Sequence, residues 1–111
     1  MSNIDRDIEG KHAQEIAMTL IANGGDARSK AIEAIEMAKD GEVEQASQLL
    51  TSAHESLLQA HKAQTSLLVQ ESSGYSIELS LLLIHAQDHL MNAMTMVDVA
   101  QCFIDLYEKI N

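Results

Sequence analysis

Two histidines and an aspartate, His85, Asp88 and His89, interrupt the apolar run between residues 79 and 96. At about 100° per residue of an α-helix, His89 lies about 40° to one side of His85 and Asp88 about 60° to the other. The three side chains would therefore share one stripe of a helix. Imidazole can move a proton, bind a metal or form a covalent bond, and a carboxylate can bind a cation. A helix does not need such a cluster to fold, so it is the candidate functional site.

Spacing alone leaves the use of these residues open. Histidines one turn apart can bind zinc, although the sequence has no HExxH segment and no cysteine pair beside them. They could equally line a partly exposed polar stripe, or one imidazole could carry covalent chemistry. One hypothesis is therefore a non-enzymatic helical module that oligomerises and binds a metal through His85, His89 and Asp88. A sugar-cleaving enzyme is disfavoured, because no carboxylate pair lies in an evident cleft.

Two further histidines, His54 and His61, lie seven residues apart on one predicted helix, and Gln64 follows His61 by one turn. This spacing favours a solvated or half-buried polar stripe. Cys102, the single cysteine, is expected to pack as a small apolar side chain.

Length and composition predict one all-α domain over residues 1–111. The chain has no proline and few glycines, and it is rich in residues that favour helices. Its net charge of −10, from 17 acidic and 7 basic residues, disfavours nucleic acid and anionic membranes as partners. The longest apolar run, residues 81–84, is too short to span a bilayer. Since a single cysteine also fits a reducing compartment, we expect a cytoplasmic protein.

Apolar residues at steps of three and four predict three helices, at about residues 7–39, 43–69 and 76–109. Residues 1–6 are expected to be frayed. Gly41 and a polar segment at 71–75 separate the helices, and Ser76 is the expected N-cap of the third. Short links predict an antiparallel, up-down-up three-helix bundle. The Asn23-Gly24-Gly25 segment interrupts the first pattern, where we expect a continuous but bent helix.

The third predicted helix has two apolar faces. The face expected to pack on the other helices comprises Leu79, Leu83, Ala86, Leu90, Ala93, Val97, Ala100 and Ile104. The second face comprises Ile77, Leu81, Ile84, Met91 and Thr95, with Asp88 among them. Because a three-helix bundle covers one face of each helix, the second face predicts self-association. Copies of Asp88 near a symmetry axis would repel unless they were protonated or shared a hard divalent cation.

Three segments resemble the lactose/cellobiose/chitobiose-type enzyme IIA of the bacterial sugar phosphotransferase system. Residues 85–91 match its HAQDHLM signature. Residues 23–29 are similar to its G-x-A-R-S segment, and residues 60–65 resemble its A-H-x-x-Q-T segment. The matches fall in order on all three predicted helices and cover nearly the whole chain.

The resemblance implies a phosphocarrier. His85 matches the histidine that accepts a phosphoryl group from phospho-HPr and passes it to the cysteine of a cognate IIB subunit. The transported sugar would be a β-linked disaccharide of the cellobiose, chitobiose or lactose type, which the chain itself does not touch. Asp88 matches a metal-binding aspartate contributed three times around the axis of a homotrimer, with Mg²⁺ as the expected ion. His89, Gln87 and His61 are expected to support His85, at sites between adjacent subunits.

Overall fold

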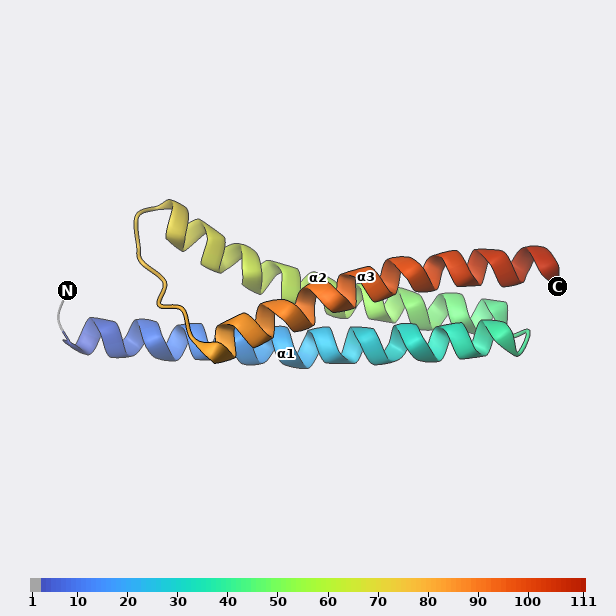
Figure 1. Ribbon diagram of the computed structural model, residues 1–111, viewed down its shortest axis with the longest axis horizontal. Helices are drawn as coiled ribbons and strands as arrows, with labels where there is room; N and C mark the ends of the chain where they lie inside the picture. Colours follow the sequence, from blue (N-terminus) through green and yellow to red (C-terminus); the bar gives the residue numbers. More distant parts are fainter. Residues whose placement is uncertain (1–2) are drawn as a thin grey trace.

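The computed structural model describes the backbone of residues 3–111 and the side chains of residues 12–111. In that part of the chain there are three helices and no strands: α1 (Asn3–Lys39), α2 (Val43–Ser72) and α3 (Leu81–Ile110). α1 and α3 run in one direction and α2 in the other, which confirms the predicted up-down-up bundle (Figure 1). The rod measures 62 × 20 × 19 Å along its principal axes. No helix within the described range is long and apolar enough to cross a membrane.

The turn between α1 and α2 forms where the sequence predicts it. Gly41 has a φ of +88°, which glycine adopts without a steric penalty. Its N–H donates to the Ala38 carbonyl at 3.0 Å, and the Glu42 N–H donates to the Met37 carbonyl at 2.9 Å. These bonds satisfy carbonyls that the end of a helix would otherwise leave unpaired.

The predicted bounds of the link between α2 and α3 are wrong. α2 continues to Ser72, and α3 begins at Leu81 rather than at residue 76. The N-cap is Ser80, whose hydroxyl accepts the Leu83 N–H at 3.1 Å, whereas Ser76 lies in the link. Both serines are suitable caps, so sequence could not choose between them. The link is held by Ile77, which packs on the core, while Leu79 is 77% exposed and does not belong to the core face.

α1 begins at Asn3, before the predicted start at residue 7. Of the frayed end predicted for residues 1–6, residues 1 and 2 lie outside the described residues, and the others belong to α1. The helix runs without interruption through Asn23-Gly24-Gly25, so the predicted continuity is confirmed. The bend expected there is not visible in Figure 1.

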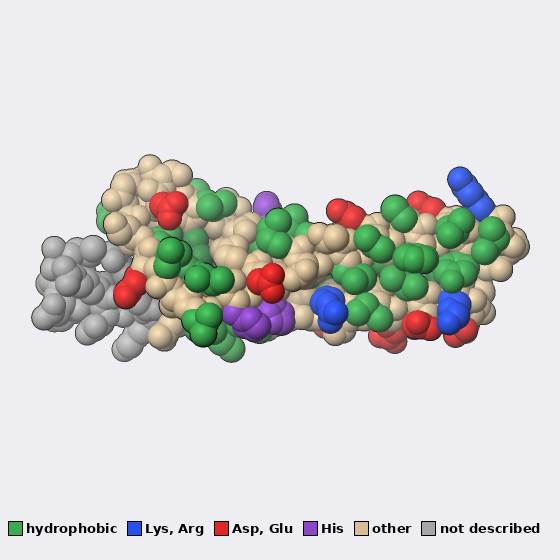
Figure 2. Space-filling view, viewed as in Figure 1, with side chains coloured by type: hydrophobic (Ala, Val, Ile, Leu, Met, Phe, Trp, Pro, Cys, Tyr) green, Lys and Arg blue, Asp and Glu red, His purple; other side chains and the backbone are tan. Residues whose placement is uncertain are grey.

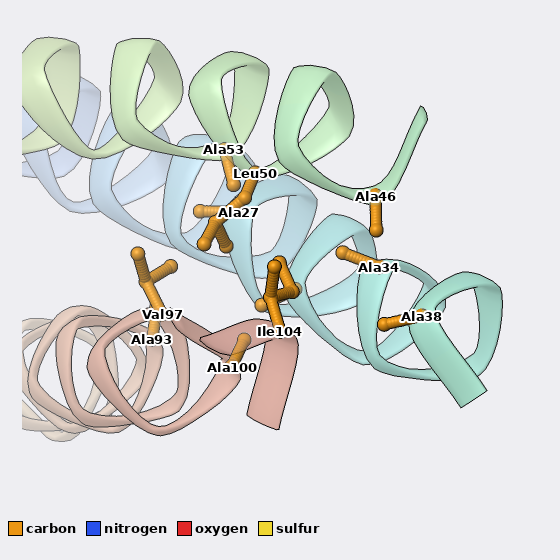
Figure 3. Close-up of a cluster of buried hydrophobic side chains, with 11 residues drawn as sticks. Ala27, Ala34, Ala38, Ala46, Leu50, Ala53, Ala93, Val97, Ala100 and Ile104 are labelled. Atoms are coloured by element: carbon orange, nitrogen blue, oxygen red, sulfur yellow. The ribbon is translucent and has the colours of Figure 1, made fainter. Parts of the chain in front are cut away.

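Alanine dominates the half of the core nearer the α1–α2 turn. A short side chain lets helix backbones pack close together, because interaxial distance depends on the residues at the contact. Figure 3 shows these side chains pointing into the space between the three helices. The buried cluster comprises Ala27, Ala31, Ala34, Ala38, Ala46, Leu50, Ala53, Ala93, Val97, Ala100 and Ile104.

Larger side chains fill the other half of the core. There α2 diverges from α1 toward the link that leads to α3 (Figure 1). The buried cluster in this half comprises Ile16, Ala17, Leu20, Ala60, Leu67, Leu83, Ala86 and Leu90. The change from alanine to leucine and isoleucine therefore follows the widening of the bundle.

A polar clasp joins α1 to α2 at the surface. Lys30 Nζ lies 2.8 Å from the Asp26 carboxylate and donates to the Ser52 hydroxyl at 2.8 Å. The Ser56 hydroxyl donates to the same Asp26 carboxylate at 2.6 Å. The hydrogen bonds from Lys30 and then Ser56 lower the pKa of Asp26, because they favour its charged form.

At Gly24, α1 comes into contact with the backbone of α3. A Cβ added to Gly24 would lie 3.4 Å from both the carbonyl carbon and the carbonyl oxygen of His89. The same atom would lie 3.5 Å from the Leu90 nitrogen. A Cβ at Gly25 would meet nothing within 4 Å. Gly24 thus permits the contact with α3, whereas Gly25 does not face it.

Enlarging Gly24 should push α1 and α3 apart. Gly24→Leu is expected to lower the free energy of unfolding by about 1–3 kcal/mol, the usual cost of overpacking. Gly25→Leu is the matched control, because it gains the same helix propensity of about 1 kcal/mol without that contact. Urea denaturation followed by circular dichroism measures both. Equal stability of the two variants would contradict the close approach.

The clasp should make a small, acid-sensitive contribution to stability. Since the folded-state pKa of Asp26 is lowered, this contribution is fully present above the ordinary value of 3.8 and is lost as the pH falls through the lowered pKa. With the Asp26 side chain 48% exposed, Asp26→Asn should cost under about 1 kcal/mol near neutral pH. Urea denaturation over a series of falling pH values should show this difference shrinking, whereas Glu33→Gln, on the same helix, should show none.

Candidate functional site

α3 separates its side chains into a buried face and an exposed one. All residues predicted for its core face are buried except Leu79, which precedes the helix. On the opposite side, Leu81, Ile84 and Met91 are 83%, 55% and 54% exposed, which confirms the predicted second apolar face. Ile77 is not part of it, because it lies in the link and packs on the core. The exposed stripe comprises Leu81, Ile84, Asp88, Met91, Thr95, Val99, Cys102, Leu106 and Ile110.

Cys102 is exposed, so the prediction that it packs in the core is wrong. Its step of seven residues from Thr95 puts it on the exposed stripe rather than on the core face. Sequence alone could not decide this, because both faces of α3 are apolar.

His85 and His89 form a direct pair on one flank of α3. Their Nε2 atoms lie 3.1 Å apart, and their rings meet edge to face with centroids 4.5 Å apart. His85 is exposed, and His89 is half-buried with its backbone against Gly24. We call this side, which faces α1, the histidine flank. Figure 2 shows histidine side chains on the surface with an acidic side chain beside them.

The contact between the two rings constrains their protons. At this distance one Nε2 must donate a proton and the other must accept it with a lone pair. If His89 Nε2 is the donor, the lone pair of His85 Nε2 is held in a defined direction. His85 then carries the proton of its neutral form on Nδ1. The arrangement can therefore select one tautomer of an accessible histidine.

Gln87 faces the other way and joins α3 to α2. Its Oε1 accepts the Gln64 Nε2–H at 2.7 Å. Gln87 lies about 160° around the helix from His89, so one chain does not bring it to the histidine pair. His61 is exposed one turn before Gln64 on α2 and belongs to the same side as Gln87. The structure thus assembles His85 with His89, but not with Gln87 or His61.

Asp88 lies on the exposed stripe rather than on the histidine flank. Its Oδ1 accepts the Asn92 side-chain N–H at 3.0 Å. Among the described residues, no three His, Cys, Asp or Glu side chains gather into a group that could hold a metal ion. A module that binds a metal through His85, His89 and Asp88 of one chain is therefore not supported. An ion at Asp88 would need ligands from further copies of the chain.

Sequence reasoning missed the role of Gly24. The sequence pattern marks the glycines at 24 and 25 as an interruption of the first helix and as part of the segment that resembles the family, but it indicates no contact for either. The structure shows that Gly24 is where α1 supports the backbone of His89. Two adjacent glycines inside a strongly helical segment are the sequence signal available for such a contact. The helix that Gly24 contacts is identified only by how α1 packs against α3.

Fold and site together define a small helical protein that presents a coupled histidine pair on its surface. Residues 15–108 match the family model described as the lactose/cellobiose-specific IIA subunit of the phosphotransferase system. The chain belongs to this family. Proteins of this family are components of a phosphotransferase, so the chain is an enzyme IIA component.

Relatives and solved structures agree with this assignment. The chain is 50% identical to the lichenan-specific phosphotransferase enzyme IIA component of Bacillus subtilis, over 87% of this chain and 88% of the relative. It is 46% identical to the lactose-specific EIIA component of Staphylococcus epidermidis, over 86% and 92%. The crystal structure of the cellobiose-specific enzyme IIA from Bacillus anthracis is 48% identical, with a TM-score of 0.86 over 88% and 90%. The chitobiose IIA of Escherichia coli, solved in complex with HPr, is 35% identical, with a TM-score of 0.74 over 88% and 95%.

Proposed function

We propose that this chain is a cytoplasmic phosphocarrier that uses His85. His85 accepts a phosphoryl group from phospho-HPr and passes it to the cysteine of a cognate IIB subunit. The observation that carries the proposal is an exposed His85 whose Nε2 lies 3.1 Å from His89 Nε2, in a chain of the IIA family. The Escherichia coli relative solved in complex with HPr supports HPr as the donor.

The transfer needs positioning more than new chemistry. In the first step the hydrogen bond from His89 to His85 Nε2 opens, and the freed lone pair forms a bond to phosphorus while the bond from phosphorus to HPr breaks. In the second step a bond from phosphorus to the IIB cysteine sulfur forms while the bond to His85 breaks. Such transfers pass through a loose transition state that depends on alignment and charge stabilisation. His85 is an exposed residue on a long, well-packed helix, which meets the requirement for alignment.

His89 supports His85 in two ways. Its Nε2–H donates to His85 Nε2 in the resting protein and selects the tautomer with a lone pair at that atom. Once the phosphoryl group arrives, the same N–H can donate to one of its oxygens. Since a hydrogen bond to a charged acceptor is stronger than one to a neutral acceptor, His89 favours the phosphorylated state.

We further propose that the chain forms a homotrimer through the exposed stripe. The stripe runs almost the full length of α3, and an apolar surface of that length favours association. In a cyclic trimer one flank of each subunit meets the opposite flank of the next. The histidine flank would then face the partner's flank that carries Gln87 and His61. In this arrangement Gln87 and His61 of one subunit would join His85 and His89 of the next in a site shared between the two.

Asp88 would bind the ion of this trimer. It lies on the exposed stripe between Ile84 and Met91, so three copies would meet at the axis. Three carboxylates offer up to six oxygens, a donor set that suits Mg²⁺. The ion would neutralise the repulsion among the carboxylates and hold the subunits together.

The sugar class is inferred from the relatives. They are named for lichenan, lactose and cellobiose. We propose a β-linked disaccharide of the cellobiose, chitobiose or lactose type, taken up by the membrane component that IIB serves.

Phosphorylation of His85 is the direct test. Incubation with enzyme I, HPr and phosphoenolpyruvate should give an acid-labile, base-stable phosphate on the wild-type chain and none on His85→Ala. His89→Gln should slow the reaction by roughly tenfold or more, the worth of one charged hydrogen bond. His54→Gln removes another exposed histidine and should react at the wild-type rate.

Two results would contradict these roles. Phosphate on the His85→Ala variant would exclude His85 as the acceptor. A His89→Gln variant that reacts at the wild-type rate would exclude the supporting role of His89 and leave that of His85 intact.

Substitution of Asp88 distinguishes the contribution of the ion to trimer stability from that of the apolar stripe. Asp88→Leu should keep or tighten the trimer and remove its dependence on a divalent ion, because it replaces three repelling charges by apolar contact. Sedimentation of wild type and variant, with and without EDTA, measures this, and Asp88→Asn controls for loss of charge alone. A folded monomer from Asp88→Leu would mean that the ion, not the apolar stripe, holds the trimer.

A further inference from the structure

Arg28 lies on α1 one turn after Gly24, at about 40° around the helix from it. Gly24 marks the side of α1 that faces α3, since it meets the His89 backbone. Asp26 and Lys30 mark the side that faces α2, since they bond to serines of that helix. Arg28 lies about 160° around the helix from both. It therefore borders α3 and points away from α2.

The histidine flank lies on the same side of the bundle as Arg28. On α3, Gln87 marks the side that faces α2, and His89 lies about 160° from it. α1 and α3 run in the same direction, so Arg28 and the histidines border the same edge of the α1–α3 contact. Figure 2 shows a basic side chain next to the histidine cluster on this face.

The positions of Arg28 and the two histidines along the bundle axis also agree with this placement. Side chains of a helix lean toward its N-terminus and cover the turn before their own Cα. Arg28, one turn beyond Gly24, therefore leans back to the level where Gly24 meets His89. His85 lies one turn before His89, toward the N-terminus of α3, and its Nε2 touches that of His89. The histidine side chains lean the same way, so Arg28 approaches the pair from its C-terminal side, through the length of its own side chain.

The negative charge of the chain makes the position of Arg28 important. The chain carries a net charge of −10, and a phosphoryl group adds further negative charge. Lys30 is bonded to Asp26 and Ser52, while Lys39 and Lys109 lie in the last turns of α1 and α3. Within residues 12–111, Arg28 is exposed and makes no ion pair. A guanidinium presents a planar fork of donors that matches phosphate oxygens better than a lysine ammonium does.

We propose that Arg28 binds the phosphoryl group while it is transferred to and from His85. This inference rests on the proposed phosphocarrier function. The guanidinium makes and breaks no covalent bond. It stabilises the charge on the phosphoryl oxygens from the α1 side, while His89 donates to them from α3. The guanidinium and the His89 N–H would then hold the group in line with the attacking nitrogen.

Arg28→Gln tests the proposal. At saturating phospho-HPr, its single-turnover rate of His85 phosphorylation should fall by roughly tenfold or more, the worth of a charged hydrogen bond. Arg28→Lys should recover part of the rate, because it restores charge without the fork. Lys39→Gln is the matched control, because it removes one positive charge from the end of the same helix. Circular dichroism and thermal melting establish that all variants fold alike.

A second readout separates phosphate binding from docking of HPr. The ³¹P resonance of the phosphorylated chain should titrate at lower pH in the wild type than in Arg28→Gln, because a guanidinium favours the more charged phosphoryl group. Rates and titrations like those of Lys39→Gln would overturn the role of Arg28. A wild-type chain that takes no phosphate at all would instead overturn the proposed function.

Discussion

Where α1 crosses α3, a Cβ at Gly24 would lie 3.4 Å from the His89 carbonyl, so the two backbones are held in contact there. This contact sets the rotation and depth of α3 at the turn that carries the histidine pair. Rotation by half a turn would bury His85 and expose Leu90, at a cost that core packing forbids. The alanine-lined half of the core continues the close packing toward the α1–α2 turn. The position of the histidine pair is thus a consequence of packing between helices.

α3 shows how a single helix can serve several purposes at once. Its core face stabilises the bundle, its exposed stripe is the proposed surface for self-association, and its histidine flank carries the pair proposed for phosphoryl transfer. Asp88 and His89 are adjacent in sequence but lie about 100° apart around the helix. One therefore belongs to the proposed trimer axis and the other to the proposed phosphoryl site. The short segment 85–91 holds groups for two different tasks because of this angular separation.

The balance of charge distinguishes the proposed site from the rest of the acidic surface. Under the proposed function an acidic chain would have to accept a doubly charged phosphoryl group, and a histidine pair alone offers little compensation. The clasp of Asp26 with Lys30 engages one cation on the α2 side of α1. Arg28 remains on the α3 side, beside the histidine flank. Placing a fixed cation there costs little folding energy, because the side chain stays in water.

Sequence alone determined the all-helical class, the three-helix order and the core face of α3, because apolar spacing at 3.6 residues per turn reports burial directly. It also singled out His85, Asp88 and His89 as chemically unusual. It could not decide where α3 begins, since Ser76 and Ser80 are equally suitable caps and only the packing of Ile77 separates them. Tertiary structure alone decided which groups meet, because the pairing of the rings and the opposite orientation of Gln87 depend on how the helices are rotated against each other.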